Sequence, residues 1–498
     1  MHVFRNMRCS LAWMAVFANC SLAAGEWTTL LDNGPSANRV DIVVLGDGYT
    51  ESDLANGVYE QHIDSYLDHM FAASLNSEPF HRYRKFFNVH AVEVVSNESG
   101  ADIPPSGVFR DTALDAKYFG DGVTERLLTI DKNKANSVRN AALVDAEFAA
   151  EMQYVVVNDT KYGGSGGSYA VFAGGSGSSS EIALHEVAHS FSNLADEYTY
   201  GADPSHYDGP EPTQVNVTAD PTGAKWAHWL NYNQPGVGVI GAFEGAKYHK
   251  TGMYRPSIDS KMRNLSRPFN AVSREKIVLD IYELVDPLDA WTDNTIPLVD
   301  PSELSVTSVD EEVIEFEWFV DNALVLSADQ STFDPTAFGY GAGEYEVTLR
   351  AFDPTGFDPV DGWVRLETSK LEQYVTWQVT ISAEEPTPAL PGDYDGDGLV
   401  DANDYVEWKS TFGDVVEPRS SADGNGDGVV NLADYHVWRN HLGLARTPST
   451  SSASQVPEPA GIVMAAMVLP LVVPYRAKRL RRAVPDSFVH QDLLRHVL

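Results

Sequence analysis

Cysteine is almost missing from this chain of 498 residues, which contains only Cys9 and Cys20. Both lie within residues 1–24, where two arginines precede a short apolar run and small residues follow it. This order is typical of a secretory signal peptide that is removed on export. We therefore expect an exported protein of the cell envelope or the extracellular space. The rest of the chain has no thiol, so disulfides and thiol chemistry are excluded there.

Positive charge is also scarce, because 35 lysines and arginines face 71 aspartates and glutamates, which gives a formal net charge of −36. Such a chain would repel a polyanion, so nucleic acid is excluded as a partner. Long hydrophobic runs are lacking as well, since the apolar segment 460–475 is slightly short for a membrane span. The length itself predicts three or more modules.

The motif His185-Glu186-Val187-Ala188-His189 is the strongest chemical signal in the chain. If the segment is helical, its two histidines lie one turn apart on the same face, where both imidazoles can bind a single ion. Neutral imidazole suits zinc, and a catalytic zinc takes three protein ligands and keeps one position for water. Glu186 follows the first histidine and is placed to accept a proton from that zinc-bound water. This is the HExxH arrangement of zinc metalloproteases.

A third ligand is expected just beyond this helix. In the metzincin pattern it follows the second histidine by six residues, after a turn at a glycine. Here that offset holds Ala195, which cannot ligate a metal, and no glycine marks the turn. We predict that Asp196 is the third ligand, with Glu197 as the alternative. Hydrogen bonding to a ligating histidine is the role that better suits Glu197.

Four stretches, in the same order along the chain, resemble the IgA-peptidase-type family of secreted bacterial zinc metallopeptidases. They are HEVAHSFSNLADEY at 185–198, the strand and turn at 40–50, the glycine- and tyrosine-containing stretch at 241–256, and the methionine segment at 261–265. The resemblance implies a zincin-like domain of mixed α/β type over residues 25–285, with one catalytic zinc held by His185, His189 and Asp196. It also implies hydrolysis of peptide bonds in extracellular proteins, with Glu186 as the general base.

Two details of the resemblance concern the surroundings of the metal. Relatives carry cysteines near the methionine segment, where this chain has Ser260, Asn270 and Ser273, so we expect packing or calcium to hold the region. Met262 is expected to form an apolar floor below the metal, because a thioether suits copper(I) better than zinc. A hydrogen-bond donor to the transition state is also expected. The candidates for this donor are Tyr248, His249 and Tyr254.

The sequence pattern changes at residue 286. Runs in which β-branched or aromatic residues alternate with polar ones appear at 313–320, 345–351 and 374–381, separated by turns rich in Gly, Asp and Pro. Such short strands predict a β-sandwich of the immunoglobulin type over residues 286–384. The region has no evident catalytic cluster, so we interpret it as a spacer or a substrate-presenting accessory domain.

A Pro/Glu-rich linker, residues 385–391, leads into an internal repeat in which an acidic loop precedes an apolar-periodic helix. Calcium needs six or seven oxygen ligands and a tight turn, and both loops have the spacing that supplies them. Two structural calcium ions are therefore expected, with Leu399 and Val429 acting through their carbonyls. The first ligand set is Asp393, Asp395, Asp397, Leu399, Asp401 and Asp404, and the second is Asp423, Asn425, Asp427, Val429, Asn431 and Asp434.

Aspartate ends each loop, where a standard EF-hand has glutamate. This makes the repeat resemble a dockerin module over residues 392–444. The resemblance implies a small α-helical EF-hand pair and a cohesin-like or cell-surface partner. Calcium-dependent folding follows from the ligands alone, whereas cohesin binding does not.

The end of the chain resembles the PEP-CTERM sorting signal of exopolysaccharide-forming bacteria. After a Ser/Thr-rich linker, residues 445–455, a Pro-Glu-Pro motif precedes an apolar segment and a basic cluster. This signal, residues 456–482, implies a transient membrane association before processing. The basic residues place the tail, 483–498, on the cytoplasmic side.

Together these patterns predict a multidomain chain with a zincin-like α/β domain, a β-sandwich and a small α-helical calcium module. The favoured function is that of a secreted zinc metalloendopeptidase that acts on protein or peptide substrates. The alternative is a non-catalytic, calcium-dependent surface or matrix protein with a relic protease fold. Glu186 favours the enzyme, because a relic does not need the base.

Overall fold

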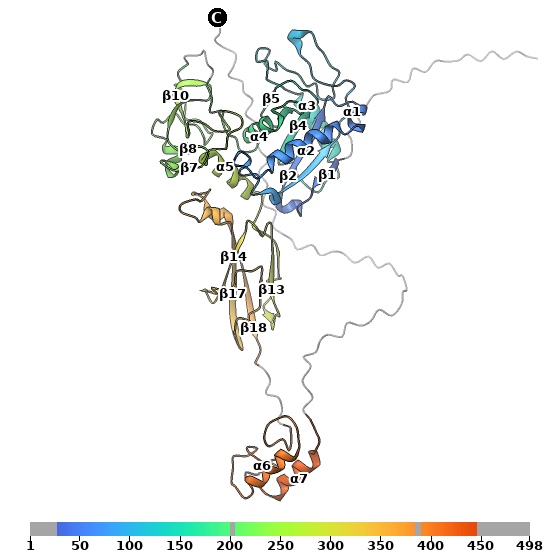
Figure 1. The fold of residues 1–498 in the computed structure, drawn as a ribbon, viewed down its shortest axis with the longest axis vertical. Coiled ribbons are helices and arrows are strands. Elements are labelled where there is room, and N and C mark those ends of the chain that lie inside the picture. Colours follow the sequence, from blue (N-terminus) through green and yellow to red (C-terminus); the bar gives the residue numbers. More distant parts are fainter. Residues whose placement is uncertain (1–26, 200–204, 384–389, 446–498) are drawn as a thin grey trace, which may run out of the picture. The chain divides into compact units, whose positions relative to one another are not determined.

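The computed structural model describes residues 27–199, 205–383 and 390–445 of the chain (Figure 1). The predicted signal peptide, the C-terminal sorting signal and the tail after it lie outside these residues. In the described part of the chain, no helix is both long and apolar enough to cross a membrane. The apolar segment 460–475, which predicted a transient membrane association, is not among the described residues.

Contacts between residues divide the chain into two compact units, 1–382 and 383–498. The described part of the first unit has two regions. We call them the six-stranded region, residues 27–285, and the two-sheet region, residues 286–382. The prediction of a mixed α/β chain is confirmed, and the arrangement is compatible with several domains.

The six-stranded region is built on one mixed sheet, with the strand order β1-β3-β2-β4-β6-β5. Its strands are β1 (Trp27–Leu31), β2 (Val40–Asp47), β3 (Phe87–Val92), β4 (Met152–Val157), β5 (Gly164–Ser165) and β6 (Ala170–Ala173). The four inner strands are parallel, whereas β1 and β5 pair antiparallel at the two edges. The strand β2 is buried along its whole length, because a parallel sheet is covered on both faces.

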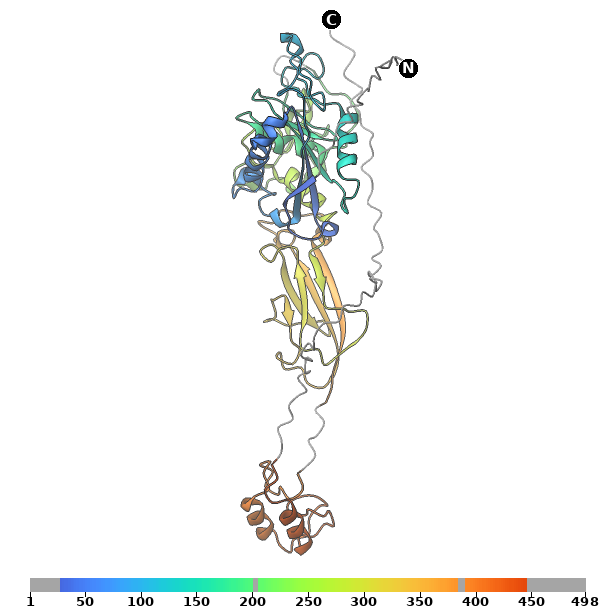
Figure 2. The same ribbon diagram turned by 90° about the vertical axis from the view of Figure 1, so that its right-hand side faces the viewer.

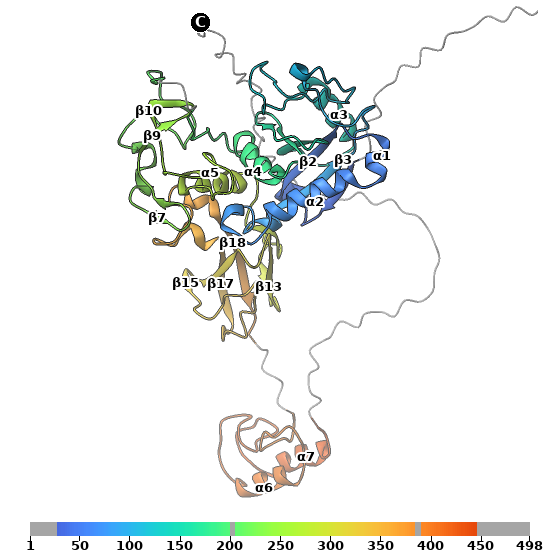
Figure 3. The ribbon, with the colours of Figure 1, turned by 45° about the horizontal axis from the view of Figure 1, so that its top comes forward.

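Helices cover both faces of this sheet (Figure 2). They are α1 (Glu51–Ala55), α2 (Val58–Met70), α3 (Lys132–Ala142), α4 (Ser179–Ser190) and α5 (Ala271–Tyr282). Alternate residues of β2 point to opposite faces. Ile42 and Val44 join the core that contains α2, α4 and α5, and Val43 and Leu45 join the core that contains α3. Helices α2 and α4 also pack against each other (Figure 3).

Two small antiparallel pairs lie between α4 and α5 in the sequence. One pairs β7 (Asn233–Gln234) with β8 (Gly238–Val239), and the other pairs β9 (Phe243–Ala246) with β10 (His249–Arg255). The second pair includes part of the stretch 241–256 that resembles the family. The turn between β9 and β10 contains Tyr248, whose hydroxyl contacts Asp196 just beyond the end of α4.

The two-sheet region contains a three-stranded and a five-stranded sheet. The first has the order β11 (Leu288–Trp291), β13 (Leu304–Ser308), β16 (Thr332–Phe333), and the second has the order β12 (Leu298–Val299), β18 (Glu372–Ile381), β17 (Gly343–Phe352), β14 (Glu315–Val320), β15 (Ala323–Leu324). Trp318 stacks on Trp377 and Phe333, with ring centroids 5.6 and 5.1 Å apart. The three predicted strands are present as β14, β17 and β18. The immunoglobulin type stays a prediction.

A buried carboxylate joins the two regions of the first unit. Asp353 has no exposed surface and accepts hydrogen bonds from Arg82 at 2.9 Å, Tyr83 at 2.6 Å and Tyr282 at 3.0 Å. All three donors belong to the six-stranded region, and one apolar core runs through both regions. The change of pattern at residue 286 therefore does not mark a loose connection.

The described part of the second unit contains the helices α6 (Ala402–Ser410) and α7 (Leu432–His441). Trp408 of α6 donates to the carbonyl of Asn431 at 2.9 Å, and Trp438 of α7 donates to the carbonyl of Asp401 at 2.7 Å. Each helix thus binds the residue that immediately precedes the other helix. These reciprocal bonds reflect the internal repeat found in the sequence.

Candidate metal centre

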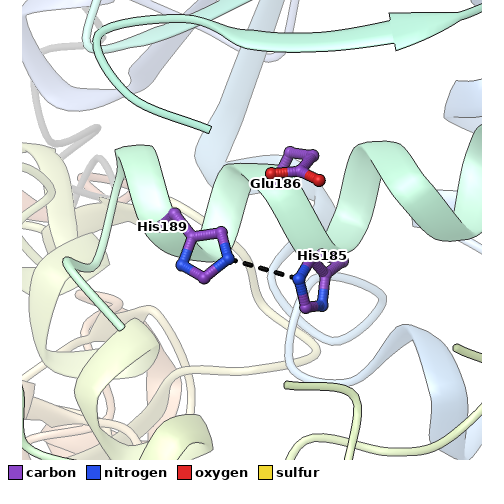
Figure 4. A group of neighbouring side chains, drawn as sticks. All are labelled: His185, Glu186 and His189. Atoms are coloured by element: carbon purple, nitrogen blue, oxygen red, sulfur yellow. Dashed lines mark hydrogen bonds between the residues drawn. The ribbon is translucent and has the colours of Figure 1, made fainter. Parts of the chain in front are cut away.

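The HExxH motif lies in the last two turns of α4, which packs against β6 and β5. His185 and His189 point toward each other from one face of the helix, and their Nε2 atoms are 3.2 Å apart (Figure 4). The two ring planes are nearly perpendicular, at 85°. The helical spacing predicted from the sequence therefore brings both imidazoles to one point.

The other nitrogen of each imidazole is bound to a backbone carbonyl. Nδ1 of His185 lies 3.0 Å from the oxygen of Lys261, and Nδ1 of His189 lies 2.6 Å from the oxygen of Leu194. A carbonyl oxygen only accepts, so we assign the hydrogen to Nδ1 in both rings. In the neutral rings, both Nε2 atoms then keep a lone pair, which is the form that binds a metal.

The turn after α4 brings Asp196 to the same point. Asn193 adopts the left-handed conformation, with φ of 49°, and the N–H of Leu194 donates to the carbonyl of Ala188 at 3.0 Å. Asparagine thus makes the turn for which the sequence offered no glycine. Oδ1 of Asp196 lies 3.1 Å from Nε2 of His185 and 3.3 Å from Nε2 of His189.

These three atoms fit the ligand set of a tetrahedral metal ion. Ligands about 2.0–2.1 Å from such an ion lie roughly 3.3 Å from one another, which matches the separations observed here. With hydrogens on both Nδ1 atoms, the two Nε2 atoms and the carboxylate oxygen are all acceptors. Three acceptors that face one another, two of them buried and that of His189 half-buried, need a shared cation or proton. The donor set therefore fits a metal.

The pKa values of the ligand residues also favour a bound cation. Burial raises the pKa of Asp196, but the two histidines outweigh burial and hold this pKa well below its ordinary value. Burial lowers the pKa of His189, but the Asp196 carboxylate outweighs burial and raises this pKa to about 9. When no cation is bound, the site therefore retains a proton, and a metal ion takes its place on binding.

Glu186 lies beside the two imidazoles. One ligand atom from each of His185, Glu186 and His189 lies within 4.8 Å of the others, so this triple overlaps the one that contains Asp196 (Figure 4). Burial raises the pKa of Glu186, and the two histidines partly offset this rise. A carboxylate with a raised pKa at the edge of a metal site is suited to accept and return a proton.

Glu197 points away from the imidazoles into a separate buried cluster. Its carboxylate accepts hydrogen bonds from Ser260 at 2.6 Å, Asn216 at 3.0 Å and Asn270 at 2.9 Å. The interpretation of Glu197 as the partner of a ligating histidine is wrong, because backbone carbonyls take that role. Ser260 and Asn270 thus hold this region through Glu197, and a calcium ion there stays a prediction.

The methionine segment passes beneath the motif. Met262 is fully buried in the main apolar core, and its carbonyl accepts a hydrogen bond from the N–H of Glu197 at 2.7 Å. The carbonyl of the preceding residue, Lys261, orients His185. The segment therefore fixes both the first histidine and the loop that carries Asp196.

Of the three predicted transition-state donors, Tyr248 is the one that the structure places against a metal ligand. Its hydroxyl donates to Oδ2 of Asp196. Tyr254 lies opposite Glu244 in the β9–β10 pair, and desolvation raises its pKa, followed by the charge of Glu244 and a hydrogen bond to it. The ring of His249 packs on Tyr207, with centroids 5.1 Å apart.

A cavity of about 310 Å³ opens beside His185 and Glu186. Sequence reasoning did not bring its lining residues together, because they come from segments far apart in the chain, and Arg126 and Tyr162 belong to no motif. Arg126 lies 5.6 Å above the ring of Tyr198 and donates to its hydroxyl at 3.3 Å. The other lining residues are Tyr162, Gly164, Ile182, Lys261, Arg263, Asn264 and Leu265.

The two acidic loops of the second unit share one geometry. Carboxylate oxygens of Asp393, Asp395 and Asp397 lie within 4.8 Å of one another. Asp404 accepts from the N–H groups of Asp395 and Asp401 at 3.1 and 2.7 Å. Asp434 accepts from the corresponding N–H groups of Asn425 and Asn431 at 3.0 and 2.7 Å. Both loops are thus folded around their last aspartate.

Comparison with known proteins identifies the family that the first unit resembles. The model of the family described as IgA peptidase M64 matches residues 28–237 and 234–281, which together cover 254 of the 498 residues. No curated protein matches significantly. One solved structure, the Bacteroides ovatus mixed-linkage glucan utilization locus SGBP-B in complex with a mixed-linkage heptasaccharide, is 13% identical with a TM-score of 0.14.

That similarity covers 21% of this chain and 27% of the solved one, so the chain spans about a quarter of its length. A TM-score this low indicates nothing about fold or function. The family match, by contrast, includes the whole HExxH motif and the methionine segment, which the structure brings together around one group of ligand atoms. This family consists of peptidases and suggests a metal-dependent one. The chain belongs to the IgA peptidase M64 family.

Proposed function

We propose that the chain is an exported, zinc-dependent endopeptidase that hydrolyses extracellular proteins. The observation that carries the proposal is the convergence of Nε2 of His185, Nε2 of His189 and Oδ1 of Asp196 within 3.1–3.3 Å of one another. Two imidazoles and one carboxylate are a ligand set that zinc prefers. A bound zinc ion supplies Lewis-acid activation of water and of the scissile carbonyl.

The protein's own residues supply the proton transfers. Glu186 accepts a proton from the attacking water and returns it to the amine that leaves when the peptide bond breaks. Its burial raises its pKa, which brings its basicity closer to that of the groups with which it exchanges the proton. Tyr248 donates its hydroxyl hydrogen to Asp196 in this structure, and we propose that this hydrogen turns to the transition state when substrate is bound. Tyr254 is not proposed, because its contacts lie elsewhere.

The second unit is proposed to be a dockerin-like module that binds two calcium ions. The support is the repeated geometry of its loops, together with the cluster of Asp393, Asp395 and Asp397. Such a module would attach the enzyme to a cohesin-like or cell-surface partner. Export and a processed PEP-CTERM signal, with transient membrane association, complete the proposal, and they rest on the sequence patterns alone.

The decisive experiment compares the purified protein with its Glu186→Ala variant on casein and on a mixture of other proteins. Both samples are loaded with zinc, and their metal content is measured. We expect the variant to bind zinc and to hydrolyse about 10²–10⁴-fold more slowly, because it lacks the general base. The protein should contain the whole first unit, because residues 286–382 share its core.

Two results would count against the enzyme. If the protein and the variant were equally inert on all substrates, and neither bound zinc, the calcium-dependent binding protein would become the better interpretation. If both hydrolysed casein at the same rate, the activity would come from a contaminant. Removal of zinc by a chelator and its return should abolish and restore hydrolysis by the unaltered protein.

A further inference from the structure

We infer that the cavity beside Glu186 is a subsite for a carboxylate of the substrate, with Arg263 as its anchor. The inference rests on the proposed peptidase function and names the substrate class. Because the cavity is lined by His185 and Glu186, its occupant belongs to a residue next to the scissile bond. The enzyme would therefore prefer peptide bonds beside a glutamate or an aspartate.

Arg263 differs from the other cations of its segment. Lys261 is fully buried and pairs with Glu181 at 2.6 Å, and Arg267 pairs with Asp259 at 2.7 Å on the surface. Arg263 is half-buried and lines the cavity, and no carboxylate of the described residues forms an ion pair with it. A partly desolvated guanidinium without a counter-ion is costly, and a substrate carboxylate would supply that counter-ion.

The charge of the cavity is opposite to that of the chain as a whole. Three cationic residues, Arg126, Lys261 and Arg263, line the cavity beside one acidic residue, Glu186, and because Lys261 is paired with Glu181 the two arginines carry the excess positive charge. The chain as a whole has twice as many acidic as basic residues, 71 against 35. A concave site that concentrates the rarer sign of charge attracts and orients a ligand of the other sign.

Arg255, which lies close enough to Arg263 for their charges to repel, adds to the positive potential. Burial lowers the pKa of Arg255, and repulsion by Arg263 lowers it further, to about 10. The guanidinium of Arg255 donates to the carbonyls of Glu244 and Gly245 and is held in place. A carboxylate bound to Arg263 would relieve this repulsion. The planar guanidinium can bind both oxygens of such a carboxylate at once.

The test uses peptides that differ at a single position next to a common scissile bond. Each peptide carries glutamate, glutamine or lysine there, and kcat/KM is measured with the zinc-loaded protein. We expect glutamate to exceed glutamine by at least about tenfold, because a charge-assisted bond is lost, and lysine to be the poorest. The preference should shrink as salt is added. Equal rates for all three peptides would overturn the inference.

Arg263→Gln should reduce the ratio of the glutamate to the glutamine rate to near one, and Arg263→Lys should leave an intermediate ratio. Arg267→Gln is the matched control, since it removes an arginine from the same segment but outside the cavity, and it should keep the full preference. If Arg263→Gln changed thermal stability but kept the preference, Arg263 would be structural and the inference would be wrong.

Two further measurements distinguish failure of the subsite from failure of the peptidase proposal, and a side-chain carboxylate from a chain-end one. Binding of the same peptides to the Glu186→Ala variant is measured by calorimetry, so that the preference can be seen without catalysis. If this binding favours glutamate while no peptide is cleaved by the unaltered protein, the subsite stands and the peptidase proposal fails. Peptides that end one residue after the bond, with a free or an amidated terminus, show whether a chain-end carboxylate fills the subsite instead of a side chain.

Discussion

Asp196 and Glu197 are adjacent carboxylates, yet their surroundings give them different chemistry. Asp196 faces two imidazoles, which hold its pKa well below the ordinary value despite burial. Glu197 faces hydroxyl and amide donors, and burial raises its pKa despite these donors and the charge of Arg255. Only the first environment favours a charged oxygen that ligates a metal. The second fixes the loop that carries the ligand.

Isosteric substitutions should separate these two roles. Asp196→Asn removes the ligand charge, so we expect zinc affinity to fall by at least about tenfold, and the zinc-free protein should also lose stability because the carboxylate that raises the pKa of His189 is gone. Glu197→Gln places an amide NH₂ against the donors of Asn216 or Asn270, which should lower the free energy of unfolding by about 1–3 kcal/mol. Competition with a chromogenic chelator and thermal unfolding measure the two effects. The assignment would be wrong if the two variants exchanged these results.

The buried pair of Glu181 and Lys261 should make folding sensitive to acid. Burial raises the pKa of Glu181, but His69 and Lys261 outweigh burial and lower it from 4.5 to about 2. In the folded protein, Glu181 thus binds its proton later than in the unfolded chain. Its contribution to stability is complete above pH 4.5 and is lost as the pH falls toward 2.

Glu181→Gln should therefore destabilise the protein most at neutral pH, and the difference from the unaltered protein should narrow by about 2 kcal/mol between pH 5 and 2, after allowance for solvent screening. Urea unfolding of both proteins at a series of pH values measures this gap. A difference in the free energy of unfolding that stayed constant with pH would show that Glu181 does not form its ion pair with Lys261.

Residue spacing alone could predict the part of the site that is local in sequence. His185, Glu186 and His189 lie on one helix, so helical geometry identifies them, and Asp196 is identified by its ligand chemistry just beyond the end of that helix. Arg126 and Arg263 could not be found in this way. They come from two loops that meet only because the sheet and α4 bring them together. The partners of Glu197 were missed for the same reason, since Asn216 and Asn270 are distant in sequence.

At the scale of elements, the short edge strand β5 can approach helix α4 closely because Gly164 and Gly166 have no side chain. A Cβ atom added at Gly166, just after β5, would lie 2.8 Å from Cβ of His189 and 3.1 Å from Oε2 of Glu186. One added at Gly164, in β5, would lie 2.4 Å from Ile182. Glycine is therefore required here for the approach of the strand to the helix.

Gly166→Ala should displace the base or the second histidine. Because a misplacement of about 1 Å can cost 10²-fold in rate, we expect hydrolysis to fall by about one to two orders of magnitude. Gly177→Ala is the control, because a Cβ atom there meets nothing within 4 Å. Rates on casein and the zinc content of both variants provide the measurement. Equal activity of the two variants would show that β5 yields without disturbing the site.

The strands of the two-sheet region could be predicted from the sequence more readily than the part of the molecule on which they pack. The runs at 313–320, 345–351 and 374–381 became strands because alternation places one face of each in a core. Their attachment to the six-stranded region was not predictable. It depends on Asp353, an ordinary aspartate in the sequence, which becomes fully buried among donors from Arg82, Tyr83 and Tyr282.

At the scale of the whole molecule, the two units differ in how they can be stabilised. The first unit has large apolar cores on both faces of its main sheet. In its described part, the second has only a few buried apolar residues, Val400, Trp408, Ala422 and Val430. A unit of this size rarely folds on apolar burial alone and usually needs a metal or a cross-link. Disulfides are excluded because the unit contains no cysteine.

Removal of calcium should therefore unfold the second unit and leave the first intact. In the first loop, Asp393, Asp395 and Asp397 repel one another unless a cation lies among them. Calorimetry of the full protein in zinc-containing buffer should show two transitions, of which calcium raises only that of the second unit. Asp423→Ala should lower the same transition, because Asp423 is predicted to ligate the second ion. Hydrolysis of casein should be unchanged in calcium-free buffer. If activity and both transitions fell together, the calcium ions would support the whole molecule rather than the second unit alone.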